Sequence, residues 1–248
     1  MDAIKRWIPN IITLGNLTCG MLACWIVPQI DFHLSGFLSY RQEYFSPEFL
    51  AYVAPSLFIF GAAIFDFLDG LAARLLNVHS ELGKQLDSLA DVVSFGVAPS
   101  FIIIGYNLMG NDYSVFGLFI GIFACIRLAK FNIDTRQSDS FLGLPVPSTG
   151  IVIASLPLID KSGPLAFMVN PWFVAGLVVL LCILMVSELP LLALKFKNYS
   201  LKDNVYRYLV LLIGLVSLVV FQFQGLPLVI LGYVLVSLIA PKKASVPI

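Results

Sequence analysis

The sequence predicts an all-α, polytopic membrane helical bundle of about eight transmembrane helices with both termini in the cytoplasm. Three observations predict this class. First, 59% of the 248 residues are hydrophobic and only 12% are charged, with a mean hydropathy of +0.92. Soluble domains contain about 25% charged residues, so this chain cannot cover a water-facing surface of its size. The other two observations are a series of apolar stretches and an uneven distribution of basic residues.

Eight stretches are apolar, and all but one have about the 20 residues that a helix needs to cross a bilayer. The exception is the fifth, which is short and contains Pro147 and Pro157. If it did not cross, every later segment would be inverted. In chain order the stretches are 10–28, 49–68, 86–109, 113–131, 147–160, 168–191, 205–222 and 225–240.

The basic residues favour eight crossings. With a cytoplasmic N-terminus, thirteen of the fifteen Lys and Arg residues lie inside, and only Arg41 and Lys161 lie outside. This follows the positive-inside rule, whereas loss of the fifth span would move the six basic residues from Lys195 onward outside. We therefore expect a single integral-membrane domain, 1–248, in contact with membrane lipids. The formal net charge of zero gives no basic field that would attract nucleic acid.

Four acids lie at the end of the second span and the start of the third: Asp66, Asp69, Asp87 and Asp91. An acid in the middle of a membrane span costs about 3 kcal/mol, so its presence indicates function. The i,i+3 and i,i+4 spacings place each pair on one helix face. A link around Gly83 makes the two helices antiparallel neighbours, so we expect the four carboxylates to converge.

Converging carboxylates repel one another unless cations lie between them. Oxygen ligands suit Mg²⁺ or Mn²⁺, and two such ions can assist an in-line displacement at phosphorus. Gly70 lets a ligand approach the helix closely, and the Arg74 guanidinium can bind phosphate oxygens. Two alternatives remain. The acids could pair structurally with Lys84, Arg74 and Arg127, or they could form the site of a divalent-cation transporter, which has no evident use for Arg74.

Residues 66–91 read D-F-L-D-G-L-A-A-R, eight residues, then G-K-Q-L-D-S-L-A-D. This pattern resembles the DxxDGxxAR–x8–GxxxDxxxD motif of the CDP-alcohol phosphatidyltransferases. The resemblance implies transfer of a phosphatidyl group from CDP-diacylglycerol to an alcohol, with release of CMP, by a homodimer in a bacterial-type inner membrane. Its site would face the cytoplasm. Asp66, Asp69 and Asp87 would bind one metal ion, and Asp66, Asp87 and Asp91 a second.

The resemblance also assigns further roles. Asp91 would be the general base, and Gly70, Ala73 and Arg74 would line the CDP site. Residues 9–20 resemble the first helix of the bacterial phosphatidylserine synthases, a branch of this family. There Asn10, Thr13 and Asn16 recur on one helix face, where they either contact the nucleotide of CDP-diacylglycerol or bond neighbouring helices.

The segments R-L-A-K-F-N at 127–132 and F-L-G-L-P-V-P at 141–147 resemble a pattern of the same branch, which implies L-serine as the acceptor. Arg127 and Lys130 lie one turn apart, where they can bind the serine carboxylate or a phosphate, and Asn132 can add a hydrogen bond. Alternatively, the two cations are positive-inside anchors. Glycerol 3-phosphate, inositol and inositol phosphate remain alternative acceptors. Gly143 and the prolines predict a turn that re-enters the membrane.

Overall fold

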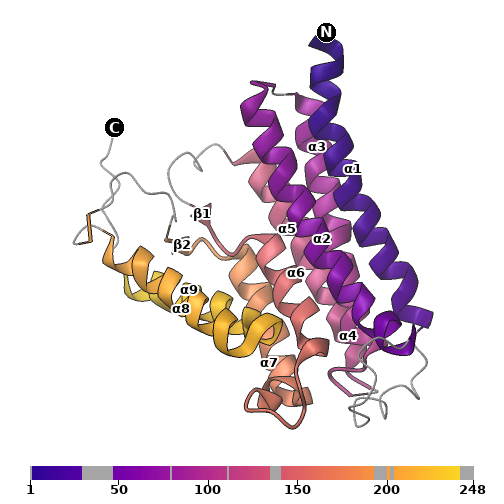
Figure 1. Cartoon of the computed structure of the whole chain (residues 1–248), viewed down its shortest axis with the longest axis vertical. Coiled ribbons are helices and arrows are strands. Elements are labelled where there is room, and N and C mark those ends of the chain that lie inside the picture. Colours follow the sequence, from indigo (N-terminus) through magenta and orange to yellow (C-terminus); the bar gives the residue numbers. More distant parts are fainter. Residues whose placement is uncertain are drawn as a thin grey trace.

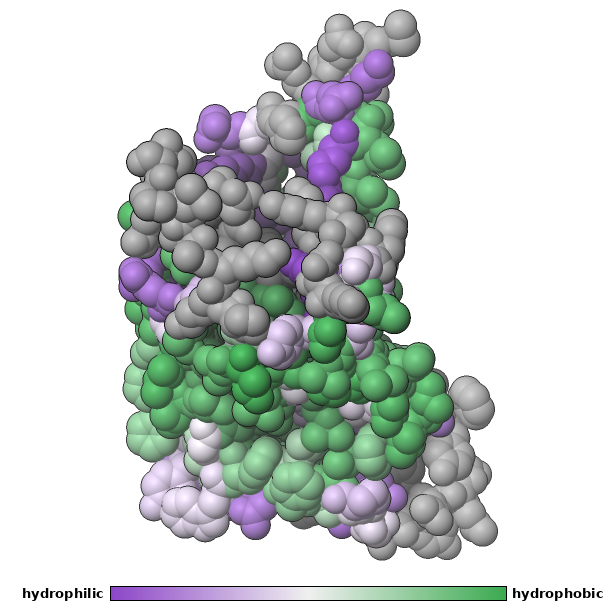
Figure 2. Space-filling view, turned by 90° about the vertical axis from the view of Figure 1, so that its left-hand side faces the viewer, coloured by the Kyte–Doolittle hydropathy of each residue, from purple (hydrophilic) through white to green (hydrophobic). Residues whose placement is uncertain are grey.

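The computed structural model describes residues 2–29, 47–78, 80–110, 112–134, 141–192, 200–201 and 204–240. Its first helices run side by side along the long axis of a bundle (Figure 1). A band of hydrophobic side chains crosses the face shown in Figure 2, with hydrophilic residues above and below it. Within these ranges, five stretches are long and apolar enough to span a membrane. The chain is therefore a polytopic membrane protein.

The five stretches overlap the eight predicted spans unevenly. Trp7–Ile26, Tyr52–Leu75, Glu81–Gly105 and Ser114–Ile133 correspond to the first four, and Val205–Ile239 contains both the seventh and the eighth. The helices of the fifth and sixth spans, Val146–Leu158 and Pro171–Val186, are apolar but shorter. Eight separate crossings therefore stay a prediction.

Helix α1 (Asp2–Ile26) packs against both α2 (Pro47–Leu75) and α3 (Glu81–Asp91). It approaches α2 closely at Gly15, where a Cβ atom would lie 2.9 Å from the Phe65 ring. Helix α2 continues beyond the second predicted span, 49–68, and ends at Leu75. Asp66 and Asp69 therefore lie within the helix, where the backbone is regularly helical on both sides of them.

Helix α3, a π-helical segment (Val92–Val97) and α4 (Ala98–Gly105) follow one another without a break. Ser80 caps α3 by accepting a hydrogen bond from the Gly83 N–H at 2.9 Å. Gly83 therefore lies in the first turn of α3, and the expectation that it forms the link was wrong. π-Helical turns are rare and often occur at functional sites, and this one begins directly after Asp91.

Helices α5 (Leu118–Ile133), α6 (Val146–Ser155) and α7 (Pro171–Val186) complete the bundle. Two short strands, β1 (Phe141–Leu142) and β2 (Pro190–Leu191), pair antiparallel, a detail that the all-α prediction missed. The next residue, Gly143, adopts a φ of +74° and continues the pairing by donating its N–H to the Leu189 carbonyl at 2.9 Å. The predicted turn at Gly143 is thus present, and it leads into α6.

Helices α8 (Val205–Phe221) and α9 (Leu226–Ile239) form a hairpin that crosses the bundle at an angle, with α9 against α6 (Figure 1). The helix ends that carry Lys5, Arg74, Lys84 and Lys130 lie at one end of the bundle, and the α6–α7 link with Lys161 lies at the other. This arrangement agrees with the predicted charge asymmetry. Arg41, Arg136, Lys195, Lys197, Lys202, Lys242 and Lys243 lie outside the described residues.

Candidate active site

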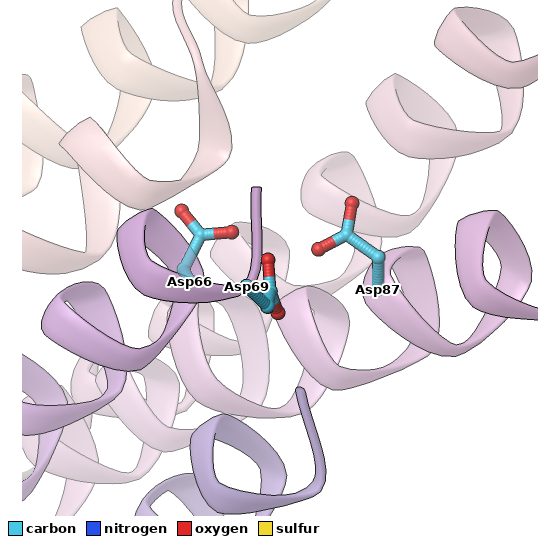
Figure 3. Close-up of side chains that lie close together, drawn as sticks. All are labelled: Asp66, Asp69 and Asp87. Carbon is cyan, nitrogen blue, oxygen red and sulfur yellow. The ribbon is translucent and has the colours of Figure 1, made fainter. Parts of the chain in front are cut away.

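Three carboxylates meet between α2 and α3. Asp66 and Asp69 project from α2, and Asp87 projects from α3 (Figure 3). One carboxylate oxygen of each residue lies within 4.8 Å of those of the other two. Asp69 is buried, and Asp66 and Asp87 are half-buried. The predicted convergence of the two helices is therefore present for these three acids.

Asp91 lies one turn after Asp87 and is buried, with 6% of its surface exposed. It is not part of the group of three that the described residues form. Its Oδ1 atom instead accepts a hydrogen bond from Asn16 Nδ2 at 3.1 Å. The structure thus separates the four predicted acids into a cluster of three and a fourth that is held one turn further along α3.

Helix α1 supplies hydrogen-bond donors to this site. Thr13 Oγ1 lies 2.7 Å from Asp69 Oδ2 and 3.0 Å from the Pro9 carbonyl, and Asn16 bonds Asp91. Asn10 is buried beside Gly83, where an added Cβ atom would lie 2.9 Å from the Asn10 Oδ1 atom. Of the two interpretations of this polar face, hydrogen bonding to neighbouring helices is therefore present at Thr13 and Asn16. Contact with a nucleotide stays a prediction.

Gly70 and Arg74 form an open, basic surface next to the acids. Arg74 Nε donates to the Gly70 carbonyl at 2.9 Å. A Cβ atom built on Gly70 would meet only the Arg74 guanidinium, at 3.8 Å, among its neighbours in the described residues. Ala73 is half-buried on the same helix. A ligand can therefore approach the α2 backbone here and contact a guanidinium at the same time.

The predicted cationic pair on α5 is divided between two environments. Arg127 is 6% exposed, and its Cζ atom lies 5.0 Å from the centre of the Phe131 ring, whereas Lys130 is exposed. Asn132 Nδ2 donates to Ser88 Oγ on α3 at 2.9 Å, and Lys84 Nζ donates to the Asn132 carbonyl at 3.1 Å. The end of α5 is therefore tied to the helix that carries Asp87 and Asp91.

Two serines of this site were absent from the sequence prediction. Ser88 accepts from Asn132, and Ser94 donates to the Asn16 carbonyl at 3.0 Å. Small polar residues often bond neighbouring helices inside membranes. The positions of Ser88 and Ser94 beside Asp87 and Asp91 could therefore have indicated that they belong to the site.

The structural-pairing alternative for the acids is not supported. Arg74 and Lys84 bond main-chain carbonyls, and Arg127 lies over an aromatic ring. In the part of the chain that the structure describes, none of these three cations forms an ion pair with the acids. Clustered carboxylates without a compensating cation repel one another, and oxygen ligands are those that hard divalent cations prefer. Asp66, Asp69 and Asp87 can therefore hold a divalent metal ion.

The fold and the site together define an integral membrane protein with a cluster of carboxylates in its helical bundle that can hold a divalent metal ion. The family model described as CDP-alcohol phosphatidyltransferase matches residues 6–193. The chain belongs to this family.

Curated relatives from bacteria and archaea also match. A CDP-diacylglycerol–serine O-phosphatidyltransferase of Helicobacter pylori strain J99 is 33% identical over 84% of this chain and 79% of its own length. A protein of the same name from Bacillus subtilis is 35% identical over 61% of this chain and 75% of its own. The archaetidylserine synthase of Methanothermobacter thermautotrophicus is 32% identical over 61% and 58%. The names of these bacterial and archaeal relatives thus all refer to serine.

Proposed function

We propose that this protein transfers the phosphatidyl group of CDP-diacylglycerol to the hydroxyl of L-serine, giving phosphatidylserine and CMP. The observation that carries the proposal is the cluster of Asp66, Asp69 and Asp87 within the family motif. The names of the relatives supply the acceptor, because CDP-diacylglycerol–serine O-phosphatidyltransferases match over most of the chain.

The three clustered acids and Asp91 would hold two divalent cations, Mg²⁺ or Mn²⁺. Asp66, Asp69 and Asp87 would bind the first ion, and Asp66, Asp87 and Asp91 the second. The fit rests on the donor set, which consists of carboxylate oxygens within 4.8 Å of one another for the first three acids. When bound, such ions would offset the negative charge of the pyrophosphate and of the departing CMP. Thr13 and Asn16 would orient the ligands Asp69 and Asp91 from α1.

The nucleotide lipid would lie against α2. The open face of Gly70 admits a phosphate close to the backbone, Ala73 adds a small side chain, and Arg74 supplies donors for phosphate oxygens. Arg74 is exposed and already oriented by its bond to the Gly70 carbonyl. Asn10, Thr13 and Asn16 would border this site from α1.

Asp91 would act as the general base. The serine hydroxyl oxygen attacks the phosphorus that carries diacylglycerol, and a new P–O bond forms there. The bond from this phosphorus to the bridging oxygen breaks, and CMP leaves with that oxygen. The hydroxyl proton passes to the Asp91 carboxylate, because a serine hydroxyl is a weak nucleophile until a base removes its proton. Arg127, Lys130 and Asn132 would bind the rest of the acceptor.

The same proposal includes eight crossings with both termini in the cytoplasm, a single domain and a homodimer in a bacterial-type inner membrane. Residues with positive charge near the acid cluster, Arg74 and Lys84, lie at the end of the bundle that also carries the N-terminus. The positive-inside rule then directs the active site towards the cytoplasm.

A panel of acceptors tests the proposed function. Purified protein in detergent receives CDP-diacylglycerol, Mg²⁺ or Mn²⁺, and one of L-serine, glycerol 3-phosphate, inositol or inositol phosphate. We expect CMP release with L-serine and not with the other three acceptors, and we expect this release to be lost when the metal is chelated. CMP release with a different acceptor would overturn the serine assignment. No release with any acceptor, together with no stabilisation by cytidine nucleotide, would overturn the transferase.

A further inference from the structure

We propose that the end of α5 recognises the acceptor as a zwitterion: Arg127 binds its carboxylate, and the side-chain oxygen of Asn132 binds its ammonium group. This inference rests on the proposed function and names how the acceptor is selected. Two buried atoms carry it, since Arg127 Nε and Asn132 Oδ1 have no hydrogen-bond partner in the described ranges. A buried polar atom without a partner costs about 1–3 kcal/mol, so both atoms are suited to a ligand that supplies the missing partners.

The hydrogen bonds around Ser88 determine which way the Asn132 amide points. The Ser88 hydroxyl donates its hydrogen to the Lys84 carbonyl at 3.2 Å, so its oxygen accepts from Asn132 at 2.9 Å. Only the NH₂ group of the amide can donate. The amide oxygen therefore faces away from Ser88, and this unpartnered atom is an acceptor and not a donor.

The packing of α5 places Arg127 and Asn132 beside one continuous stretch of α3 and the π-helical segment. Gly96 lies against Ala124, and Ser88 bonds Asn132, so α5 runs antiparallel to α3 and the π-helical segment. Arg127 lies about one turn after Ala124. Because the helices are antiparallel, it is about level with the first residues that follow Asp91. Its guanidinium lies over the ring of Phe131, one helical turn further along α5. Arg127 and Asn132 thus lie on the part of α5 that packs against the end of α3 and the π-helical segment, next to Asp87 and Asp91 in sequence.

The two atoms have opposite requirements, and this selects the class of ligand. The Arg127 Nε–H needs an acceptor such as a carboxylate oxygen, and Asn132 Oδ1 needs a donor such as an ammonium group. A hydroxy-amino acid provides both on one carbon atom. Inositol has neither charge, and glycerol 3-phosphate has no cationic donor. Lys130 is exposed and has no comparable unmet requirement, so the structure assigns discrimination to Arg127 and Asn132.

Two analogues of serine test the two contacts separately. Ethanolamine lacks the carboxylate, and 3-hydroxypropionate lacks the ammonium group, while both keep the hydroxyl. CMP release gives kcat/KM for each acceptor with CDP-diacylglycerol and metal present. A site built to bond a polar group rejects an analogue without it, and we expect serine to be preferred over each by about 10²-fold or more.

Each variant should lose one preference and keep the other. In Arg127→Met the preference for serine over ethanolamine falls at least tenfold, while the preference over 3-hydroxypropionate is retained. Asn132→Leu gives the reverse. Asn132→Asp keeps an oxygen acceptor but loses the donor to Ser88, so it should retain the preference for an ammonium group. Ile133→Asn, at an exposed neighbouring position, is the matched control and should change neither preference.

The outcomes separate this inference from the proposed function. Equal loss of activity with all three acceptors in Arg127→Met or Asn132→Leu would indicate a structural role and overturn the inference. Stabilisation by CDP and metal, measured by thermal unfolding, identifies variants that fold and bind nucleotide. If the wild-type protein releases no CMP with serine, the proposed function itself fails. If the wild-type protein does release CMP with serine but both variants keep both preferences, only the zwitterion site is wrong.

Discussion

The α1–α3 region, taken together with the π-helical segment that follows it, and the α8–α9 hairpin are both apolar helical structures, but their polar side chains bond different groups. In the first, Thr13, Asn16 and Ser94 are buried and bond partners on other helices. In the hairpin, large apolar side chains such as Leu215, Val219 and Leu235 are exposed. Its ties to the rest of the chain include hydrogen bonds between Leu192 and both Tyr233 and Ser237.

A Cβ atom added at one glycine of each region would meet a different kind of atom. At Gly20 a Cβ atom would lie 2.7 Å from the main-chain Cα atom of Ser94, whereas at Gly232 it would meet the Ile213 side chain at 2.7 Å. A side chain can rotate away, but a main-chain atom cannot. The family model ends at residue 193 and so includes the first region but not the hairpin. We infer that the Gly20 contact beside the acids is less able to relax than the Gly232 contact in the hairpin.

The largest expected effect comes from Asp91→Asn. The amide keeps an oxygen that can accept from Asn16 but cannot take the serine proton. We expect kcat to fall by about 10²–10⁴-fold, the usual contribution of a general base, with stabilisation by CDP and metal retained. Steady-state CMP release and thermal unfolding measure the two quantities. Wild-type turnover in this variant would exclude Asp91 as the base.

The close approach of α1 to the π-helical segment gives the next effect. Gly20→Ala should move Asn16 and Ser94 apart and displace Asp91, and a misplacement of about 1 Å can cost about 10²-fold in rate. The KM for serine and kcat are compared with those of Gly176→Ala, where no neighbouring atom lies within 4 Å of the added Cβ in the described structure. Equal activity of the two variants would contradict a rigid α1–α3 geometry.

Thr13→Val removes the 2.7 Å hydrogen bond to Asp69 while nearly keeping the side-chain volume. Residues that orient metal ligands typically contribute about 10–100-fold in metal affinity. We expect half-maximal activity to need correspondingly more Mg²⁺ or Mn²⁺, with kcat largely restored at saturation. A metal titration of CMP release measures this. An unchanged titration curve would mean that Thr13 does not orient a metal ligand.

The smallest expected effect on catalysis is that of Gly232→Ala in the hairpin. Its added Cβ atom would lie 2.7 Å from the Cγ2 methyl group of Ile213, and overpacking of this kind costs about 1–3 kcal/mol when it cannot relax. We expect a lower thermal midpoint and kcat/KM for serine close to wild type. A loss of activity as large as that of Gly20→Ala would remove the contrast between the two regions.

Much of the site was predictable because its chemistry is local in sequence. The i,i+3 spacing places Asp66 and Asp69 on one helix face, and a short link between α2 and α3 brings Asp87 back to them. The separation of Asp91 from the cluster was not predictable, because it depends on Asn16, which lies 75 residues earlier. The unequal burial of Arg127 and Lys130 was not predictable either, because it also depends on contacts with a distant part of the chain. Their exposure depends on where α5 packs against the π-helical segment.

The sequence by itself determined that this is a polytopic membrane protein with an acidic site of the CDP-alcohol phosphatidyltransferase pattern. Composition, helical spacing and the motif are properties of the chain that need no knowledge of packing. The tertiary structure decided that α1 supplies hydrogen bonds to Asp69 and Asp91. It also decided that α5 carries a buried donor and a buried acceptor without a partner among the described residues. These contacts join residues far apart in the chain. They follow from close helix packing at glycines, which no local pattern specifies.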